Sequence, residues 1–433
     1  MRWWLVVVCL LLGTGCGSRC KEVEHARAAL RAHVGAKGRV ADVRVTVPFA
    51  RANEVFAASL ARQALTVPLE LPELPVPIEV PAFAATVREV TVVPAAVGKV
   101  RFATAIEVRD AEAEVATLRM EVEVAPVLER VDGGAQLSIG FGPENVVGIE
   151  PALGAEARQA LGAVIERWLP AKAKGKVPRP LLELAAGKLA EQLTKGTYAA
   201  LQRTLLPKLG ELTRLRLRLP AVPVARVELR SAEAALVVEI LTSLPVRAGL
   251  VASEEASEEA SEEASEVRVE LAASAVAELA NWAIDEGHAP RWYDRGLAPR
   301  EDGEYRPRFD YIAEDRAHPF KVYLFQERGG CSYFRVGAQA ALAMKGEQLE
   351  ATVVDRALER SAAHPVIEAA AAVKYFLVGS LDRSKQVAAA TRLAVGGRAF
   401  ETRVTEAAIE RDAVRFTLRF EAAPTLSSWR GTR

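Results

Sequence analysis

The chain has 433 residues, half of them apolar, and its 56 basic side chains balance 56 acidic ones. This length and apolar fraction are enough for two or three domains with their own cores. A formal charge of zero disfavours nucleic acid as a partner, because phosphate binding needs a basic surface. We therefore expect a globular protein that does not bind nucleic acid.

The first residues have the pattern of a secretory signal peptide. Met1 and Arg2 precede an apolar run over residues 3–12, which is too short to span a bilayer as a mature helix. Gly-Thr-Gly then leads to Cys16, and the segment resembles a bacterial lipobox, although Gly13 stands where such signals usually carry leucine. The resemblance implies removal of residues 1–15 and acylation of Cys16. Ordinary secretion with cleavage nearby is the alternative.

Acylation of Cys16 would anchor the chain at a membrane, because each buried methylene contributes about 0.8 kcal/mol. No later run approaches twenty uncharged apolar residues, so nothing else in the sequence is expected to span a membrane. We expect a lipid-anchored protein on the periplasmic face of a bacterial cell envelope. Gly17 stands where an aspartate often retains lipoproteins at the inner membrane, which favours the outer membrane.

Two further cysteines, Cys20 and Cys331, would reach an oxidising compartment. A disulfide between them is permitted there, but a single pair at such long spacing does not specify one. The alternative is two unpaired thiols, with Cys20 in a flexible tether and Cys331 in a strand.

An acidic repeat divides the chain, since residues 252–266 read ASEEASEEASEEASE. Glutamates four apart without opposing bases disfavour a helix and cannot bury a core, so we interpret the repeat as a spacer. The predicted organisation is a signal peptide (1–15), a lipidated tether with a short helix over 24–33 (16–39), a first module (40–248), the spacer (249–266), a second module (267–424) and a C-terminal tail (425–433).

Each half begins with a strand followed by an amphipathic helix. In the first half, alternating valines over residues 43–47 precede apolar residues at helical spacing over 50–65. The second half repeats this order over 267–286. Residues 43–45 and 267–269 both read Val-Arg-Val and align without a gap. The match indicates an internal duplication, with chance similarity between two strand-helix segments as the alternative.

Each half then continues with antiparallel strands, a long helix with an apolar stripe, and closing strands. In the first half we predict strands over 86–94, 99–109, 113–125 and 134–142, helices over 154–169 and 180–206, and strands over 213–219, 224–231 and 234–242. In the second half we predict a helix over 273–286, strands from 305 to 358, a helix over 364–378, and strands over 386–395, 399–409 and 413–421. The predicted fold class is α+β, with two tandem modules that each wrap a curled antiparallel sheet on a long helix.

In this order of elements the chain resembles the tubular lipid-binding (TULIP) superfamily, related to bactericidal/permeability-increasing protein. The resemblance covers about residues 40–242 and 267–421, and no diagnostic motif accompanies it. It implies elongated modules with an apolar groove that accepts lipid or another apolar ligand. The expected groove residues lie on the long helices, and the alternative is that they are ordinary core: Leu189, Leu193, Leu201, Val373 and Phe376.

Motifs for nucleophilic, metal or phosphate chemistry are missing from the sequence, including G-x-S-x-G, H-E-x-x-H, C-x-x-C and a glycine-rich phosphate loop. Five histidines are scattered without metal-ligand spacing. We therefore expect no catalytic residue, no metal and no cofactor.

One dense polar and aromatic stretch runs from residue 285 to 318. Rings beside acids and arginines are typical of sugar or peptide recognition, because a ring stacks on an apolar face while charges bind polar groups. The candidate recognition residues are His288, Arg291, Trp292, Tyr293, Tyr305 and Arg308. The alternatives are a capping loop held by surface ion pairs, and an unrecognised hydrolase that uses a carboxylate pair.

Two hypotheses of function follow from these patterns. The first is a membrane-anchored lipoprotein that binds or shuttles lipid in a groove between the sheet and the long helix. The second is a non-catalytic envelope protein that binds glycan, peptidoglycan or a protein partner through residues 285–318.

Overall fold

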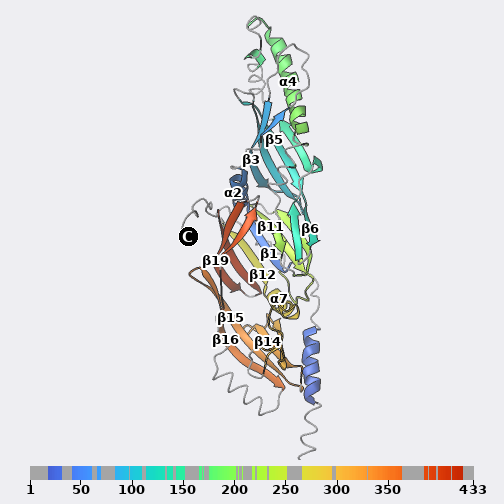
Figure 1. The fold of residues 1–433 in the computed structure, drawn as a ribbon, viewed down its shortest axis with the longest axis vertical. Coiled ribbons are helices and arrows are strands. Elements are labelled where there is room, and N and C mark those ends of the chain that lie inside the picture. The colour runs from blue at the N-terminus through green and yellow to red at the C-terminus, as the bar shows by residue number, and fades with distance from the viewer. Residues whose placement is uncertain are drawn as a thin grey trace, which may run out of the picture.

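A computed structural model gives the fold of the chain, which is elongated (Figure 1). It describes residues 18–31, 41–60, 66–69, 83–96, 98–109, 114–131, 134–139, 143–151, 165–167, 169, 175–200, 203, 207, 217–219, 222–231, 234–250, 266–294, 299–328, 330–362, 385–388, 390–395, 398–410 and 412–422. None of the described helices is long and apolar enough to cross a membrane.

The two halves of the chain meet in one seven-stranded antiparallel sheet, the central sheet (Figure 1). Its strands, in spatial order, are β10 (Val224–Ser231), β11 (Ala235–Thr242), β1 (Val43–Pro48), β12 (Val267–Ala272), β20 (Ala413–Ala422), β19 (Arg398–Glu410) and β18 (Ala390–Val395). The first strand of each half lies in the middle, side by side with its counterpart. The halves are therefore joined through a shared sheet.

The register of the central sheet supports the internal duplication. Val45 of β1 lies opposite Val269 of β12 in an antiparallel pair. A two-fold rotation about this pair superimposes the two Val-Arg-Val segments in the gapless alignment seen in the sequence. The same rotation carries β11 onto β20, because Val45 also faces Val238 and Val269 also faces Phe416. The two halves thus place corresponding strands on either side of the β1–β12 pair.

A five-stranded sheet of the first half has the one dry face that its alternating sequence predicts. Its strands, in spatial order, are β2 (Thr66–Leu69), β3 (Phe83–Val93), β4 (Val100–Arg109), β5 (Glu114–Val124) and β8 (Val146–Pro151). Phe102 and Ile106 of β4, and Leu118 and Met120 of β5, are at most 1% exposed. Pro68 lies in the edge strand β2, where a missing N–H costs no ladder hydrogen bond.

Two helices and a small sheet complete the described part of the first half. The helix α2 (Phe49–Leu60) packs on β3, and the Val92 N–H donates to Asn53 Oδ1 at 2.6 Å. The long helix α4 (Arg179–Ala200) has Pro180 in its first turn, where proline is favoured, and lies at one end of the molecule (Figure 1). The small sheet contains β6 (Pro126–Val131), β7 (Gly134–Ile139) and β9 (Leu217–Leu219), and a short 3-10 helix, η1, spans Pro143–Asn145.

The second half builds a five-stranded sheet next to the helix α7 (Ala273–Asp285). Its strands, in spatial order, are β13 (Tyr305–Tyr311), β14 (Phe320–Gln326), β15 (Tyr333–Lys345), β16 (Gln348–Ala362) and β17 (Lys385–Ala388). The second predicted long helix, over 364–378, lies outside the described residues. Among the described residues, α4 has no counterpart in the second half, so the predicted pair of sheets wrapped on long helices is not seen.

The N-terminal helix, residues 18–31, packs on the sheet of the second half (Figure 1). Cys20 and Cys331 form a disulfide with a Cα–Cα distance of 5.0 Å. Val23 is buried against Tyr323, Phe325 and Tyr333. The sequence predicts a helix over 24–33 after a short tether; in the structure residues 18–23 are helical as well, because the disulfide and the apolar face around Val23 hold this segment to the sheet. Cys331 lies in the turn before β15 and not in a strand.

Gly337 of β15 leaves room for a buried ion pair, and Gly337→Ala is expected to break it. A Cβ at this position would clash with the carboxylate of Glu359 and lie 2.7 Å from the Cβ of His318. Glu359 pairs with Lys321, whose side chain is 2% exposed. We expect the free energy of unfolding to fall by about 1–3 kcal/mol in urea denaturation. Gly148→Ala is the control, because nothing lies within 4 Å of the added Cβ; equal stability of both variants would contradict the crowding.

Candidate functional site

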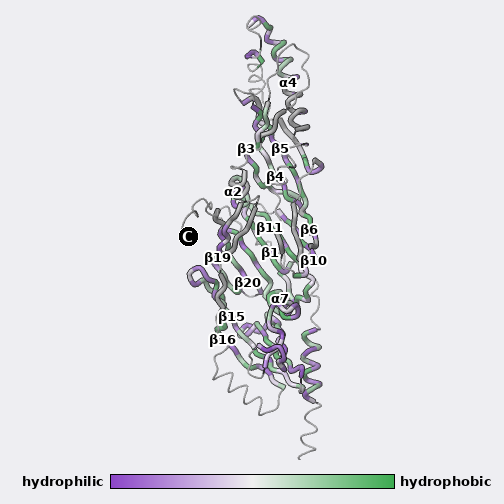
Figure 2. Tube along the Cα trace, viewed as in Figure 1, coloured by the Kyte–Doolittle hydropathy of each residue, from purple (hydrophilic) through white to green (hydrophobic). Residues whose placement is uncertain are grey.

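The central sheet places charged and apolar side chains on opposite faces. Successive side chains of a strand point to opposite sides, so Val43, Val45 and Val47 of β1 share one face while Arg44 and Thr46 share the other. Figure 2 shows hydrophobic and hydrophilic residues interleaved along these central strands. The two faces therefore offer different chemistry to a ligand.

The face that carries Val45, here named the apolar face, is continuous across six strands. One row of register-opposed side chains is Leu229, Val238, Val45, Val269, Phe416 and Ala407, and the next row is Val227, Ile240, Val43, Leu271, Val414 and Ile409. All of these except Leu229 and Val414 are only half-buried. The dry face of the first-half sheet is packed far more completely, so the apolar face keeps accessible hydrophobic surface.

The opposite face carries a row of alternating charges, here named the charge ladder: Arg230, Glu239, Arg44, Glu270 and Arg415. The Arg44 guanidinium donates to Glu239 Oε1 at 3.0 and 3.1 Å and to Glu270 Oε2 at 3.3 Å. Arg230 Nη2 donates to Glu239 Oε1, and Arg415 Nε donates to Glu270 Oε1, both at 2.8 Å. Burial alone would raise the pKa of Glu239, but the hydrogen bonds from Arg230 and Arg44 outweigh it and lower the pKa. The ladder therefore ties the two halves together with satisfied ion pairs.

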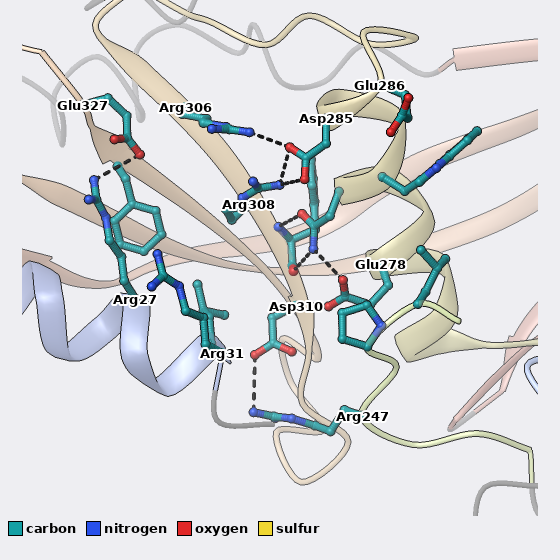
Figure 3. Close-up of a pocket in the computed structure, with 17 residues that line it drawn as sticks. Arg27, Arg31, Arg247, Glu278, Asp285, Glu286, Arg306, Arg308, Asp310 and Glu327 are labelled. Carbon is teal, nitrogen blue, oxygen red and sulfur yellow. Dashed lines mark hydrogen bonds and ion pairs between the residues drawn. The ribbon is translucent and has the colours of Figure 1, made fainter. Parts of the chain in front are cut away.

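A charged cleft lies between the N-terminal helix, α7, β13 and the segment 243–250 (Figure 3). Its volume is about 560 Å³. Five guanidiniums line it: Arg27, Arg31, Arg247, Arg306 and Arg308. Trp282, Phe309 and Phe325 supply aromatic surface in the same cleft.

Carboxylates in the cleft pair with most of these arginines (Figure 3). Arg27 pairs with Glu327 at 3.1 Å, and Arg247 pairs with Asp310 at 3.5 Å. Arg306 and Arg308 both bind Asp285, at 2.6 and 2.9 Å. Burial opposes ionisation of Asp285, but the hydrogen bonds from Arg308 and Arg306 prevail and lower its pKa.

Glu278 of α7 lies in the same cleft and has the opposite shift. Burial raises the pKa of Glu278, and the charge of nearby Asp310 adds to the rise against a hydrogen bond from Asn281. A carboxyl group in this setting favours its neutral form more than an exposed glutamate does.

The six candidate recognition residues do not form one loop, because residues 305–311 are the strand β13. Arg308 lines the charged cleft, and Arg291 donates to the backbone oxygen of Asp285. The His288 ring lies 5.2 Å from the ring of Trp282, centroid to centroid. These three residues are thus near the cleft.

The other three candidates lie elsewhere on the second half. Tyr305 is 4% exposed and packs on Phe334, with ring centroids 6.1 Å apart. Tyr293 pairs with Tyr305 through its backbone. The guanidinium of Arg328 lies 4.5 Å above the ring of Trp292. Tyr305 is therefore a core residue of this sheet.

Of the predicted groove residues, Leu189 is the only one whose backbone and side chain both belong to the described part of the chain. Leu189 lies in α4 with its side chain completely buried. Leu193 also lies in α4, but its side chain is outside the described part of the chain, as are Leu201, Val373, Phe376 and Cys16. The apolar face was missed as a site because its alternating valines also fit an ordinary buried strand.

Within the described part of the chain, no group of three or more His, Cys, Asp or Glu side chains could hold a metal ion.

No protein-family model matches the chain, and no curated protein sequence matches it. Among solved structures, the chain is similar to P47 from Clostridium botulinum A2, with 8% identity and a TM-score of 0.36 over 88% of this chain and 97% of that one. It is similar to P47 of Clostridium botulinum E1, with 9% identity and a TM-score of 0.36 over 87% and 98% of the two chains. It is also similar to a lipopolysaccharide binding protein, with 9% identity and a TM-score of 0.26 over 89% and 99%.

Proposed function

We propose that this protein is a membrane-anchored envelope lipoprotein that binds or shuttles lipid at the apolar face of its central sheet. The observation that carries the proposal is the apolar face itself, where rows of Val, Leu, Ile and Phe cross six strands and stay half-buried. Contiguous apolar surface that packing leaves accessible marks binding sites. A carrier of this kind binds its ligand without a catalytic residue.

The ligand class follows from the chemistry of this face. Aliphatic side chains without interleaved polar groups contact acyl chains favourably, because each methylene removed from water contributes about 0.8 kcal/mol. The two-fold repeat at the central sheet and the long helix α4 agree with the expectation of a tubular lipid-binding fold. The signal-like segment that ends at Cys16 supports anchoring at the periplasmic face of a membrane, with the outer membrane favoured.

A second function is favoured by the charged cleft, which would suit a glycan, peptide or protein partner of the envelope. Arg308 and Asp285 lie in it beside Trp282, and such a combination of ring, acid and arginine recognises polar ligands.

The test of lipid binding is native mass spectrometry of the Cys16→Ser chain, purified without detergent. We expect bound lipid, and we expect a Val45→Thr/Val238→Thr/Val269→Thr variant to bind phospholipid at least tenfold more weakly. Each threonine keeps the shape of valine but sets an unpaired hydroxyl against an acyl chain, at a cost of about 1 kcal/mol or more.

The matched control is Val354→Thr, because Val354 is a 63% exposed valine on β16, outside the central sheet. Its phospholipid binding should equal that of the parent chain. Consistently empty protein that also ignores added phospholipid would contradict the proposal.

A further inference from the structure

The charged cleft is built from two parts of the chain that are far apart in sequence. Arg27, Leu30 and Arg31 form one wall and come from the N-terminal helix. The other walls come from α7, from β13 and from the segment that contains Arg247. Figure 3 shows Arg27 and Arg31 projecting from that helix toward the strand of Arg306 and Arg308. The cleft therefore exists only while the N-terminal helix is docked.

Guanidiniums outnumber their carboxylate partners in the cleft. Asp285 is shared by Arg306 and Arg308, so one carboxylate faces two positive groups. Arg31 makes no ion pair with any residue in the described ranges. Five guanidiniums thus stand against three paired carboxylates, those of Glu327, Asp310 and Asp285.

The remaining two acids of the lining, Glu278 and Glu286, make no ion pair with these guanidiniums among the described residues. Burial raises the pKa of Glu278. Glu286 is exposed, and Figure 3 draws it at the end of α7, on the opposite side from Arg27 and Arg31.

Three guanidinium N–H donors of the cleft also lack acceptors. The Nε atoms of Arg27, Arg247 and Arg306 are buried, and none of them has a hydrogen-bond acceptor among the described residues. A buried donor without an acceptor is costly, so a ligand oxygen that reached one of these N–H groups would be bound favourably. Trp282 and Phe325 add apolar ring surface to the cleft.

We propose that this cleft binds an oxyanion, a phosphate or carboxylate group carried on a small organic ligand, and that Arg31 is its principal free contact. A planar guanidinium matches the oxygens of such groups with two parallel hydrogen bonds. The volume of about 560 Å³ exceeds that of a bare phosphate and falls within the range of small-molecule sites. The site lies apart from the apolar face and does not depend on lipid binding there.

The site is also linked to the disulfide. Cys20 holds the helix that carries Arg27 and Arg31 to Cys331, next to the strand β15. Release of the helix would remove two of the five guanidiniums together with the Leu30 wall. Oxidation of this cysteine pair is therefore expected to assemble the site.

Isothermal titration of the Cys16→Ser chain with inorganic phosphate and with glycerol 3-phosphate tests the proposal. Both should bind, with glycerol 3-phosphate tighter, and Arg31→Ala should weaken binding about tenfold. Lys21→Ala is the matched control: Lys21 is exposed on the same helix, outside the lining, so this variant should bind like the parent. Absence of binding to both probes, or equal binding by Arg31→Ala, would overturn the proposal.

Two further experiments identify the source of the oxyanion and test whether binding needs the docked helix. Flotation with phosphatidylglycerol/phosphatidylcholine vesicles that depends on Arg31 assigns the oxyanion to a lipid headgroup, whereas binding of the water-soluble probes alone assigns it to a free ligand. The Cys20→Ser/Cys331→Ser variant should lose at least tenfold in affinity for glycerol 3-phosphate. Undiminished binding by this variant would overturn the dependence on the docked helix.

Discussion

Replacement of Arg44 by alanine is expected to lower the free energy of unfolding by about 3–5 kcal/mol. The side chain of Arg44 is 3% exposed, and it joins Glu239 of the first half to Glu270 of the second. Its removal leaves Glu239, at 2% exposure, with the half-exposed Arg230 as its one remaining ion-pair partner among the described residues. A buried carboxylate that loses a partner keeps its desolvation cost, so the loss exceeds that of a surface ion pair. Urea denaturation at neutral pH measures the difference.

Arg268→Ala is the matched control for this prediction. Arg268 of β12 is equivalent to Arg44 of β1 under the two-fold rotation, but its side chain is exposed. We expect its substitution to change the free energy of unfolding by less than about 0.5 kcal/mol. Similar losses for both arginines would show that the charge ladder does not hold the halves together.

Most local elements of this fold could be predicted, because periodicity reports which side chains a strand or helix buries. The strand over 224–231 has the predicted bounds, and α7 ends one residue before its predicted end. The alternation around Leu118 correctly gives a sheet with one dry face. These features depend on neighbouring residues only.

The pairing of the two halves could not be predicted from local patterns. Alternation around Val45 indicates an apolar side of β1, but it also suggests that Arg44 faces solvent. Arg44 is buried because glutamates from β11 and β12, 195 and 226 residues away in sequence, neutralise it. Such partners become neighbours only through strand order, which periodicity does not encode.

The same limit applies to the candidate site. The stretch 285–318 contains Arg308, which lines the charged cleft, but Arg27 and Arg31 come from the other end of the chain. Val23, Ala26 and Leu30 follow helical spacing and pack on the core cluster of the second half. This apolar stripe indicates that the helix packs against another part of the protein. It does not indicate which surface the helix packs on.

Loss of the disulfide is expected to detach the N-terminal helix and to lower the free energy of unfolding by about 2–5 kcal/mol. The bond closes a loop of 311 residues, which restricts the unfolded chain over most of its length. Among the described residues, the helix has modest further attachments: the Val23 cluster, the Arg27 guanidinium over the Phe325 ring, and the partly exposed ion pairs Arg27–Glu327 and Arg360–Glu22. We therefore expect the amide hydrogens of residues 18–31 to exchange much faster in the Cys20→Ser/Cys331→Ser variant, as hydrogen-exchange mass spectrometry can measure.

The sheet beneath the helix provides the internal control for this experiment. Amides of β14 and β15 are held by strand pairing, so their exchange should change far less than that of residues 18–31. Reductant should speed exchange in the parent chain and leave the double-serine variant as it was. Equal protection of the helix with and without the bond would mean that the packing of Val23 is sufficient. In that case the disulfide would stabilise the fold only through the unfolded chain, and oxidation would not assemble the cleft.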